Sequence, residues 1–204
     1  MMKKPNKKKF SGFTYPEAFK HLNLKELNVW RFEAEPLEPS TFFQERLRRM
    51  TEVFDLQSYE ESKKLLIDAI CEEAIYGCKH LKIWKGAQLT DETASGYVDY
   101  LIAERKRYLE APFLCIVEAK KDDFEQGLAQ CLVEMKACQY SNRAIDKLLD
   151  VFGIVTNGGS WQFYRLRLDG NVDETAIYST GNMADLLGRL RYIFQLCEQN
   201  ISLS

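Results

Sequence analysis

Ionisable side chains within two apolar segments of strand length restrict the fold more than any other feature of this chain. Asp99 lies in the segment Ser95–Tyr100, and Glu118 and Lys120 lie at the end of a second apolar segment. Burial of a charge is unfavourable unless the charge is paired or bound to a metal ion. Side chains alternate along a strand, so Glu118 and Lys120 share one face of theirs. If the two strands are neighbours, Asp99 meets both residues near the strand ends, and a functional site is expected there.

The order of the apolar segments predicts an α/β fold with a central mixed sheet flanked by helices. Strands are expected at 81–84 (with an extension to 89), 97–103, 113–119, 152–156, 161–166 and, at an edge, 175–178. Helices are expected to begin near Thr14, at Ser40, at the capping box Ser58-Tyr-Glu-Glu61 and at Asp123, and a last helix to span 183–199. A helix, three strands, a helix, further strands and a helix are typical of such a sheet.

Composition indicates one soluble domain. The 204 residues are 46% hydrophobic and 28% charged, which is ordinary for a globular chain with one core. Residues 1–12 are basic and lack apolar periodicity, which predicts a flexible basic arm followed by a single domain over 13–204. Since no apolar run could span a bilayer and no signal core follows the first residues, a cytoplasmic protein without membrane contact is expected.

The cysteines do not indicate a metal site. The six cysteines include no C-x-x-C pair and no spacing typical of zinc ligands. We expect them to be buried, reduced and used as small hydrophobic residues.

The two carboxylates and the lysine are suited to phosphodiester hydrolysis. Carboxylate oxygens and the backbone that follows Glu118 are ligands that Mg²⁺ or Mn²⁺ prefers. Such an ion activates bound water and stabilises charge on a phosphoryl oxygen, and a lysine beside it can position the attacking water. Taken singly, an acid at a strand end is more often a cap, and an E-x-K sequence is more often a solvated ion pair. The combination, in this order, favours a site.

These residues resemble motifs II and III of the PD-(D/E)XK nuclease superfamily. Gly96 precedes Asp99 by three residues, the next strand ends in Glu118-Ala-Lys120, and the helical segment Phe124-Glu-Gln-Gly-Leu-Ala-Gln130 follows. The pattern is similar to that of the nuclease domains of type I restriction R-subunits. It is also similar to an uncharacterised, largely cyanobacterial group with a G-x-x-D strand, an EAK strand and a GLxQCxxEM helix. The resemblance covers about residues 58–166, although Val98 stands where the motif has proline, a proline that many members also lack.

The resemblance implies a restriction-endonuclease-like core and a metal-dependent DNA endonuclease, a phosphodiester hydrolase that uses Mg²⁺ or Mn²⁺. Asp99 and Glu118 would bind the metal. An acid on the preceding helix would complete the set. Glu73 is preferred to Glu72 because it continues the row of Leu66 and Ile70 on that helix.

The remaining roles follow from the same resemblance. Glu118 and Lys120 would position and activate water. Gln126 and Gln130 lie four residues apart, hence on one helical face, and would hold the lysine or a phosphate.

The expected partners are nucleic acid, with DNA preferred, and either a second copy of the chain or a partner subunit. The chain carries no helicase motor, so any translocation would require another chain. The net charge of −2 and the pI of about 5.8 count against nucleic-acid binding, although a basic patch can exist on an acidic protein. The alternative is a catalytically inactive nuclease-fold module that binds nucleic acid or protein.

Overall fold

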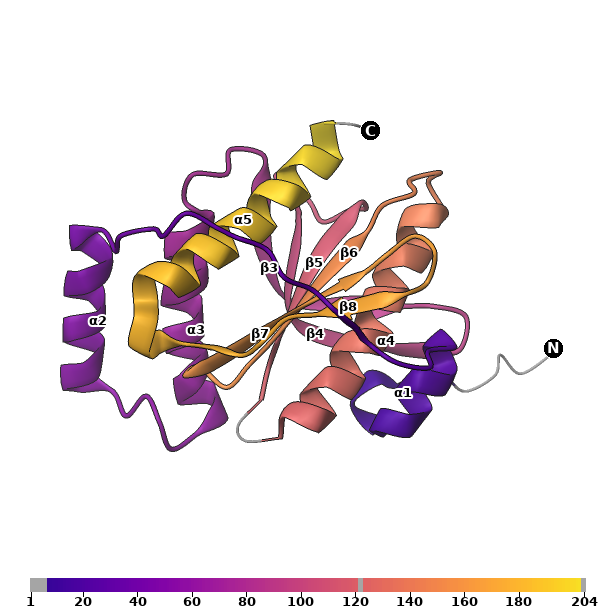
Figure 1. The fold of residues 1–204 in the computed structure, drawn as a ribbon, viewed down its shortest axis with the longest axis horizontal. Coiled ribbons are helices and arrows are strands. Elements are labelled where there is room, and N and C mark those ends of the chain that lie inside the picture. Colours follow the sequence, from indigo (N-terminus) through magenta and orange to yellow (C-terminus); the bar gives the residue numbers. More distant parts are fainter. Residues whose placement is uncertain (1–6, 121–122, 203–204) are drawn as a thin grey trace.

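A mixed β-sheet with helices on both faces forms the framework of the protein (Figure 1). The computed structural model describes residues 7–120 and 123–202. Its strands are β1 (Lys8–Lys9), β2 (Asn28–Val29), β3 (Leu81–Thr90), β4 (Ala94–Glu104), β5 (Phe113–Ala119), β6 (Val151–Thr156), β7 (Ser160–Leu166), β8 (Val172–Glu174) and β9 (Tyr178–Ser179). Its α-helices are α1 (Tyr15–Leu22), α2 (Thr41–Val53), α3 (Glu60–Ile75), α4 (Phe124–Arg143) and α5 (Met183–Ser202), with short 3₁₀ turns η1 (Phe10–Gly12) and η2 (Thr180–Asn182).

The sheet combines antiparallel and parallel pairs. The strand order is β1-β4-β5-β6-β7-β8-β2, with β3 also paired to β4 and β9 to β7. The β3–β4, β4–β5 and β6–β7 pairs are antiparallel, whereas β5 and β6 are parallel and are joined by the crossover helix α4. A parallel pair requires such a crossover. The predicted α/β class with a mixed sheet and flanking helices is confirmed.

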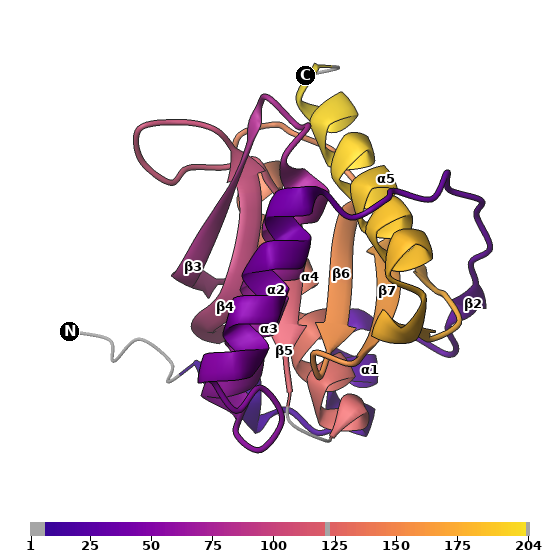
Figure 2. The same ribbon diagram turned by 90° about the vertical axis from the view of Figure 1, so that its left-hand side faces the viewer.

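Two hydrophobic layers hold the helices against the sheet. One face carries α3 and α5, with α2 outside α3, and the other carries α4 and α1 (Figures 1 and 2). Ile67 and Ile70 of α3 belong to the first layer, and Leu132 of α4 belongs to the second. Within the described residues, no helix is both long enough and apolar enough to cross a membrane. All six cysteines are buried and free, as predicted.

Helix starts follow the predicted caps except at α3. Thr14 and Glu17 form a capping box at α1, and the Ser40 side chain accepts a hydrogen bond from Phe43 N at α2. Tyr59 is the N-cap of α3, without a side-chain cap, so the capping box predicted at Ser58 is wrong. The reason is that the backbone N–H of Ser58 donates to Asp55 Oδ1, which places Ser58 in the preceding turn.

The edge strand expected at 175–178 is also displaced, because β8 ends at Glu174 and β9 begins at Tyr178. The Thr175 hydroxyl accepts a hydrogen bond from Phe163 N and donates one to Ala176 O. The Thr175 backbone N–H still donates to Phe163 O, but its hydroxyl takes the Phe163 N–H that a strand carbonyl would accept, so the strand is interrupted after Glu174.

The flexible arm predicted for residues 1–12 is wrong for residues 7–12, and residues 1–6 lie outside the described part of the chain. Lys8 and Lys9 form β1, which pairs in parallel with Ala94 and Ser95 of β4. Phe10 is only 1% exposed, and its ring packs against Gly96. A Cβ added at Gly96 would lie 2.7 Å from this ring, which is too close. The absence of a side chain at Gly96 thus allows the amino-terminal segment to dock onto β4.

Candidate functional site

The candidate site lies where β4 separates from β5. The ladder between these strands ends at the Tyr100–Val117 pair. One residue earlier, Asp99 Oδ2 accepts a hydrogen bond from Ala119 N at 3.0 Å, so a side chain replaces the contact between strands. On the other side of β4, Gly86 has a φ of 63°, a left-handed conformation that glycine adopts readily, and the β3–β4 ladder skips this position. The Asp99 carboxylate is thereby held beside the end of β5.

Glu118 and Lys120 form an ion pair at this strand end. Lys120 Nζ lies 2.8 Å from Glu118 Oε1, and the Glu118 residue is 0% exposed. The approach lacks hydrogen-bond alignment, and neither Glu118 oxygen accepts a hydrogen bond from the described residues. Buried carboxylate oxygens without such partners are unusual, and they indicate a group that is protonated or that binds a cation.

The environment of Glu118 favours its protonated form. Burial and, to a smaller extent, the negative charge of Asp99 raise the pKa of Glu118, Lys120 opposes both effects, and the resulting pKa is about 7. Burial lowers the pKa of Lys120, but the neighbouring Glu118 carboxylate outweighs that effect and the net pKa is raised. The site therefore joins a cationic lysine to a carboxyl group that can exchange a proton near neutral pH.

A buried polar chain leads from Lys120 into helix α4. Lys120 Nζ donates to Gln130 Oε1 at 3.1 Å, and Gln130 Nε2 donates to Glu134 Oε1 at 2.9 Å. The pKa of Glu134 is raised well above its ordinary value, first by burial and then by the charge of Glu118. Sequence reasoning assigned no role to Glu134, although its position one helical turn after Gln130, among apolar residues, was a usable signal.

Lys64 of α3 contacts the site from the opposite face of the sheet. Its Nζ lies 3.0 Å from Asp99 Oδ1, 3.0 Å from Glu61 Oε1 and 3.4 Å from Glu60 Oε1. Burial lowers the pKa of Lys64, but its bonds to Glu61 and Asp99 outweigh this and raise the net pKa. Sequence reasoning did not identify Lys64, because nothing in the pattern indicated which turn of α3 faces Asp99.

Neither Glu73 nor Glu72 joins the two carboxylates, which corrects the predicted third acid. Glu73 accepts hydrogen bonds from the Ser40 backbone N–H at 2.7 Å and from the Ser40 hydroxyl at 3.0 Å. Glu72 pairs with Arg46 of α2. Glu73 follows Lys64 by nine residues, a rise of about 13 Å along a helix. The first turns of α3 cover the site, and these glutamates anchor α2 instead.

Gln126 also points elsewhere, in contrast to the prediction. Its side-chain Nε2 lies 3.2 Å from the carbonyl oxygens of Ser11 and Phe13 and donates to them. Gln126 thus ties α4 to the amino-terminal segment, and of the two predicted glutamines it is Gln130 that contacts Lys120.

Gly127 makes room for the lysine. A Cβ at this position would lie 3.0 Å from Lys120 Cγ and 2.8 Å from Val155 Cγ1, both closer than side chains normally approach. The stem of Lys120 therefore passes against the backbone of α4, and a larger residue at Gly127 would displace it.

The donor set is compatible with one hard divalent ion. Among the described residues there is no cluster of three or more His, Cys, Asp or Glu side chains that could hold a metal. Asp99 and Glu118 nevertheless supply carboxylate oxygens on adjacent strands, and those of Glu118 lack hydrogen-bond donors. Mg²⁺ commonly uses one or two carboxylates and keeps several waters, so a two-carboxylate site fits it.

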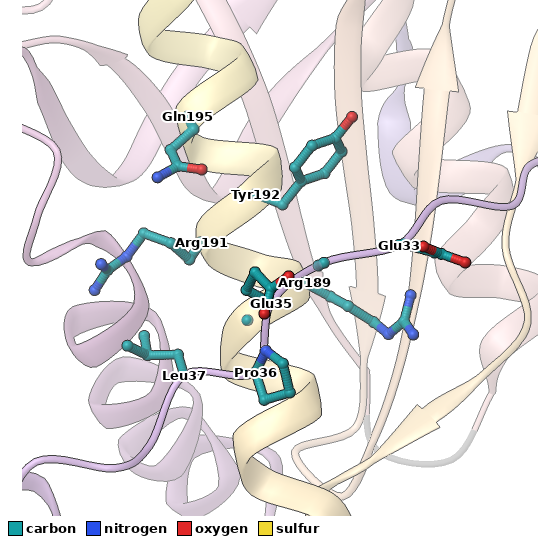
Figure 3. A pocket seen from close by; sticks show the side chains of 10 residues that line it. Glu33, Glu35, Pro36, Leu37, Arg189, Arg191, Tyr192 and Gln195 are labelled. Carbon is teal, nitrogen blue, oxygen red and sulfur yellow. The ribbon is translucent and has the colours of Figure 1, made fainter.

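The cavity shown in Figure 3 is a separate feature, formed where residues 33–37 cross α5. Its volume is about 670 Å³. The guanidinium of Arg189 donates to Asp185 and to Phe32 O, and that of Arg191 donates to Ala74 O at the carboxyl end of α3. Both arginines of this cavity are thus engaged by groups of the protein itself.

Comparisons with known proteins leave the family open. No protein-family model matches the chain. A stretch of 52 residues is 46% identical to Crinkler effector protein 5 of Phytophthora infestans, which amounts to 26% of this chain and 14% of that protein. The chain thus spans about one seventh of the length of this relative.

Proposed function

We propose that this protein is a metal-dependent nuclease with a restriction-endonuclease-like core, and that it hydrolyses phosphodiester bonds in DNA. The observation that supports this most directly is the meeting of Asp99, Glu118 and Lys120 where two adjacent strands separate. Packing alone does not explain a buried glutamate whose oxygens accept no hydrogen bond from the described residues.

Each residue has a defined task in this proposal. Asp99 and Glu118 hold Mg²⁺ or Mn²⁺, which when bound supplies an activated water and charge stabilisation at phosphorus. Lys120 stays cationic because its pKa is raised, and it orients the water and offsets the charge that develops on the phosphoryl oxygen. Gln130 holds the Lys120 ammonium from the side of α4.

The test is a cleavage assay with the purified protein on duplex DNA, single-stranded DNA and RNA, with Mg²⁺, Mn²⁺ or EDTA. Lys120→Ala should reduce cleavage by about 100-fold or more, the scale of a lost acid–base or charge-stabilising group. Lys79→Ala is the matched control, because Lys79 is exposed and lies beyond the far end of α3. Cleavage that resists EDTA, or that survives in folded Lys120→Ala, contradicts the proposal.

The second candidate is a catalytically inactive module of the same fold that binds nucleic acid or protein. The observation that favours it is the ion pair between Lys64 and Asp99, which occupies an oxygen that a metal would use. In that case, calorimetry should detect no Mg²⁺ or Mn²⁺ binding, and Lys120→Ala should bind DNA as the wild type does. Metal binding that is lost in Asp99→Asn would exclude this candidate.

A further inference from the structure

Helix α4 buries a carboxyl group that its packing does not require. Glu134 is 0% exposed, and its Oε2 accepts no hydrogen bond from the described residues. A buried carboxyl group is destabilising unless it is fully satisfied, and an apolar residue of similar size would fill the same space. Glu134 interacts electrostatically with Glu118, and its hydrogen bond is to Gln130, whose Nε2 lies 2.9 Å from Glu134 Oε1.

That contact determines which end of the Gln130 amide faces Lys120. An amide has an accepting oxygen at one end and a donating NH₂ group at the other. With the NH₂ group bound to Glu134, the oxygen is directed to Lys120 Nζ, at 3.1 Å. In the reversed orientation the NH₂ group would face the ammonium, two donors would oppose each other, and Lys120 would lose an acceptor.

We propose that Glu134 is a positioning residue of this site: it fixes the Gln130 amide and, through it, the ammonium of Lys120 beside Glu118. The inference rests on the proposed nuclease function for its catalytic meaning. Its geometric content, that Glu134 restrains Lys120, can be measured without substrate.

Variants at Glu134 separate positioning from packing. Glu134→Leu keeps the volume but removes the acceptor, so Lys120 is released; the loss of a buried carboxyl group favours folding, whereas the Gln130 NH₂ group left without its acceptor opposes it. Glu134→Gln keeps a carbonyl oxygen that can accept from Gln130. Gln139→Leu is the matched control, because Gln139 is a second buried polar residue of α4, and it donates to the carbonyl oxygens of Leu166 and Arg167 instead.

The first readout is the rate at which an amine-reactive reagent labels Lys120 in the substrate-free protein, followed by mass spectrometry. We expect labelling to rise at least fivefold in Glu134→Leu and to stay within twofold of wild type in Glu134→Gln and Gln139→Leu. Labelling of folded Glu134→Leu at the wild-type rate would overturn the inference. If Glu134→Leu does not fold, Glu134→Met is judged by the same criterion.

The second readout is catalysis under metal saturation. Glu134→Leu should lower kcat at least tenfold with little change in KM, because a displaced catalytic group affects the chemical step, whereas Glu134→Gln should retain most of kcat. An unchanged kcat in Glu134→Leu would refute the positioning role. If the wild-type protein cleaves no nucleic acid, the proposed function fails, and the labelling rates alone decide whether Glu134 positions Lys120.

Discussion

The folded protein keeps the proton of Glu118 to a higher pH than the unfolded chain does. The metal-free protein should therefore become less stable as the pH rises towards neutrality. At low pH both the folded and the unfolded chain carry the proton on this residue. As the pH passes 4.5, the ordinary glutamate value, the unfolded chain releases its proton, whereas the folded protein keeps its own until about pH 7. The folded state then binds more protons than the unfolded state, so the free energy of unfolding falls with rising pH across this window.

The size of the effect follows from the same two values. The pKa of Glu118 is raised from 4.5 to about 7, and at ~1.4 kcal/mol per pH unit the difference corresponds to about 3 kcal/mol. The raised pKa of Glu134 acts in the same direction. Carboxyl groups with lowered pKa values act in the opposite direction, so the contribution of Glu118 must be isolated by comparison with a variant.

The assay is urea unfolding in EDTA from pH 4.5 to 8, applied to the wild type and to Glu118→Gln. The stability of Glu118→Gln relative to wild type should grow by about 3 kcal/mol over this range, because the amide does not ionise. Mg²⁺ at pH 8 should stabilise the wild type much more than the variant, since it binds the ionised carboxylate. Parallel stability curves for the two proteins would refute the reasoning, because they would mean that Glu118 titrates alike in the folded and unfolded states.

Three substitutions test other parts of the site. Gly127→Ala should cost about 1–3 kcal/mol in urea unfolding and slow single-turnover cleavage at least tenfold, because its methyl group would lie 3.0 Å from Lys120 Cγ; an unchanged rate would contradict this. Lys64→Met should tighten Mg²⁺ binding several-fold by calorimetry, because it removes a cation 3.0 Å from Asp99 Oδ1, and equal affinities would count against metal binding at Asp99. Glu73→Ala should lower stability by about 1 kcal/mol through the weakened start of α2 and leave kcat and metal affinity unchanged; lost metal affinity would return this glutamate to the site.

The sheet and the meeting of its central strands could be predicted because both depend on local signals. Apolar runs with β-branched and aromatic residues mark β5 and β6, and the sequence Asn157-Gly-Gly-Ser160 between β6 and β7 is typical of a hairpin turn. Asp99 and Glu118 each lie in such a run, so adjacency of β4 and β5 was sufficient to bring them near each other.

The helical contributions could not be predicted in the same way. Periodicity indicates which residues share a face of a helix, but it does not indicate how far along its axis the helix lies over the sheet. Lys64 and Glu73 of α3 differ mainly in this axial position, and Lys64 is the one that reaches Asp99. Similarly, Gln126 and Gln130 lie on one side of α4, and only the docking of the amino-terminal segment, with carbonyl groups that need donors, separates their roles.

The two carboxylates differ in a way that bears on the choice between nuclease and inactive module. Asp99 is engaged at both oxygens, by Lys64 and by Ala119 N, whereas the Glu118 oxygens accept no hydrogen bond from the described residues. A divalent ion would therefore bind the Glu118 carboxylate first, and it would bind Asp99 Oδ1 only after displacing Lys64. That displacement need not isolate the ammonium, because Glu61 lies 3.0 Å from Lys64 Nζ in the same arrangement. The ion pair with Asp99 therefore does not by itself argue against metal binding at Asp99.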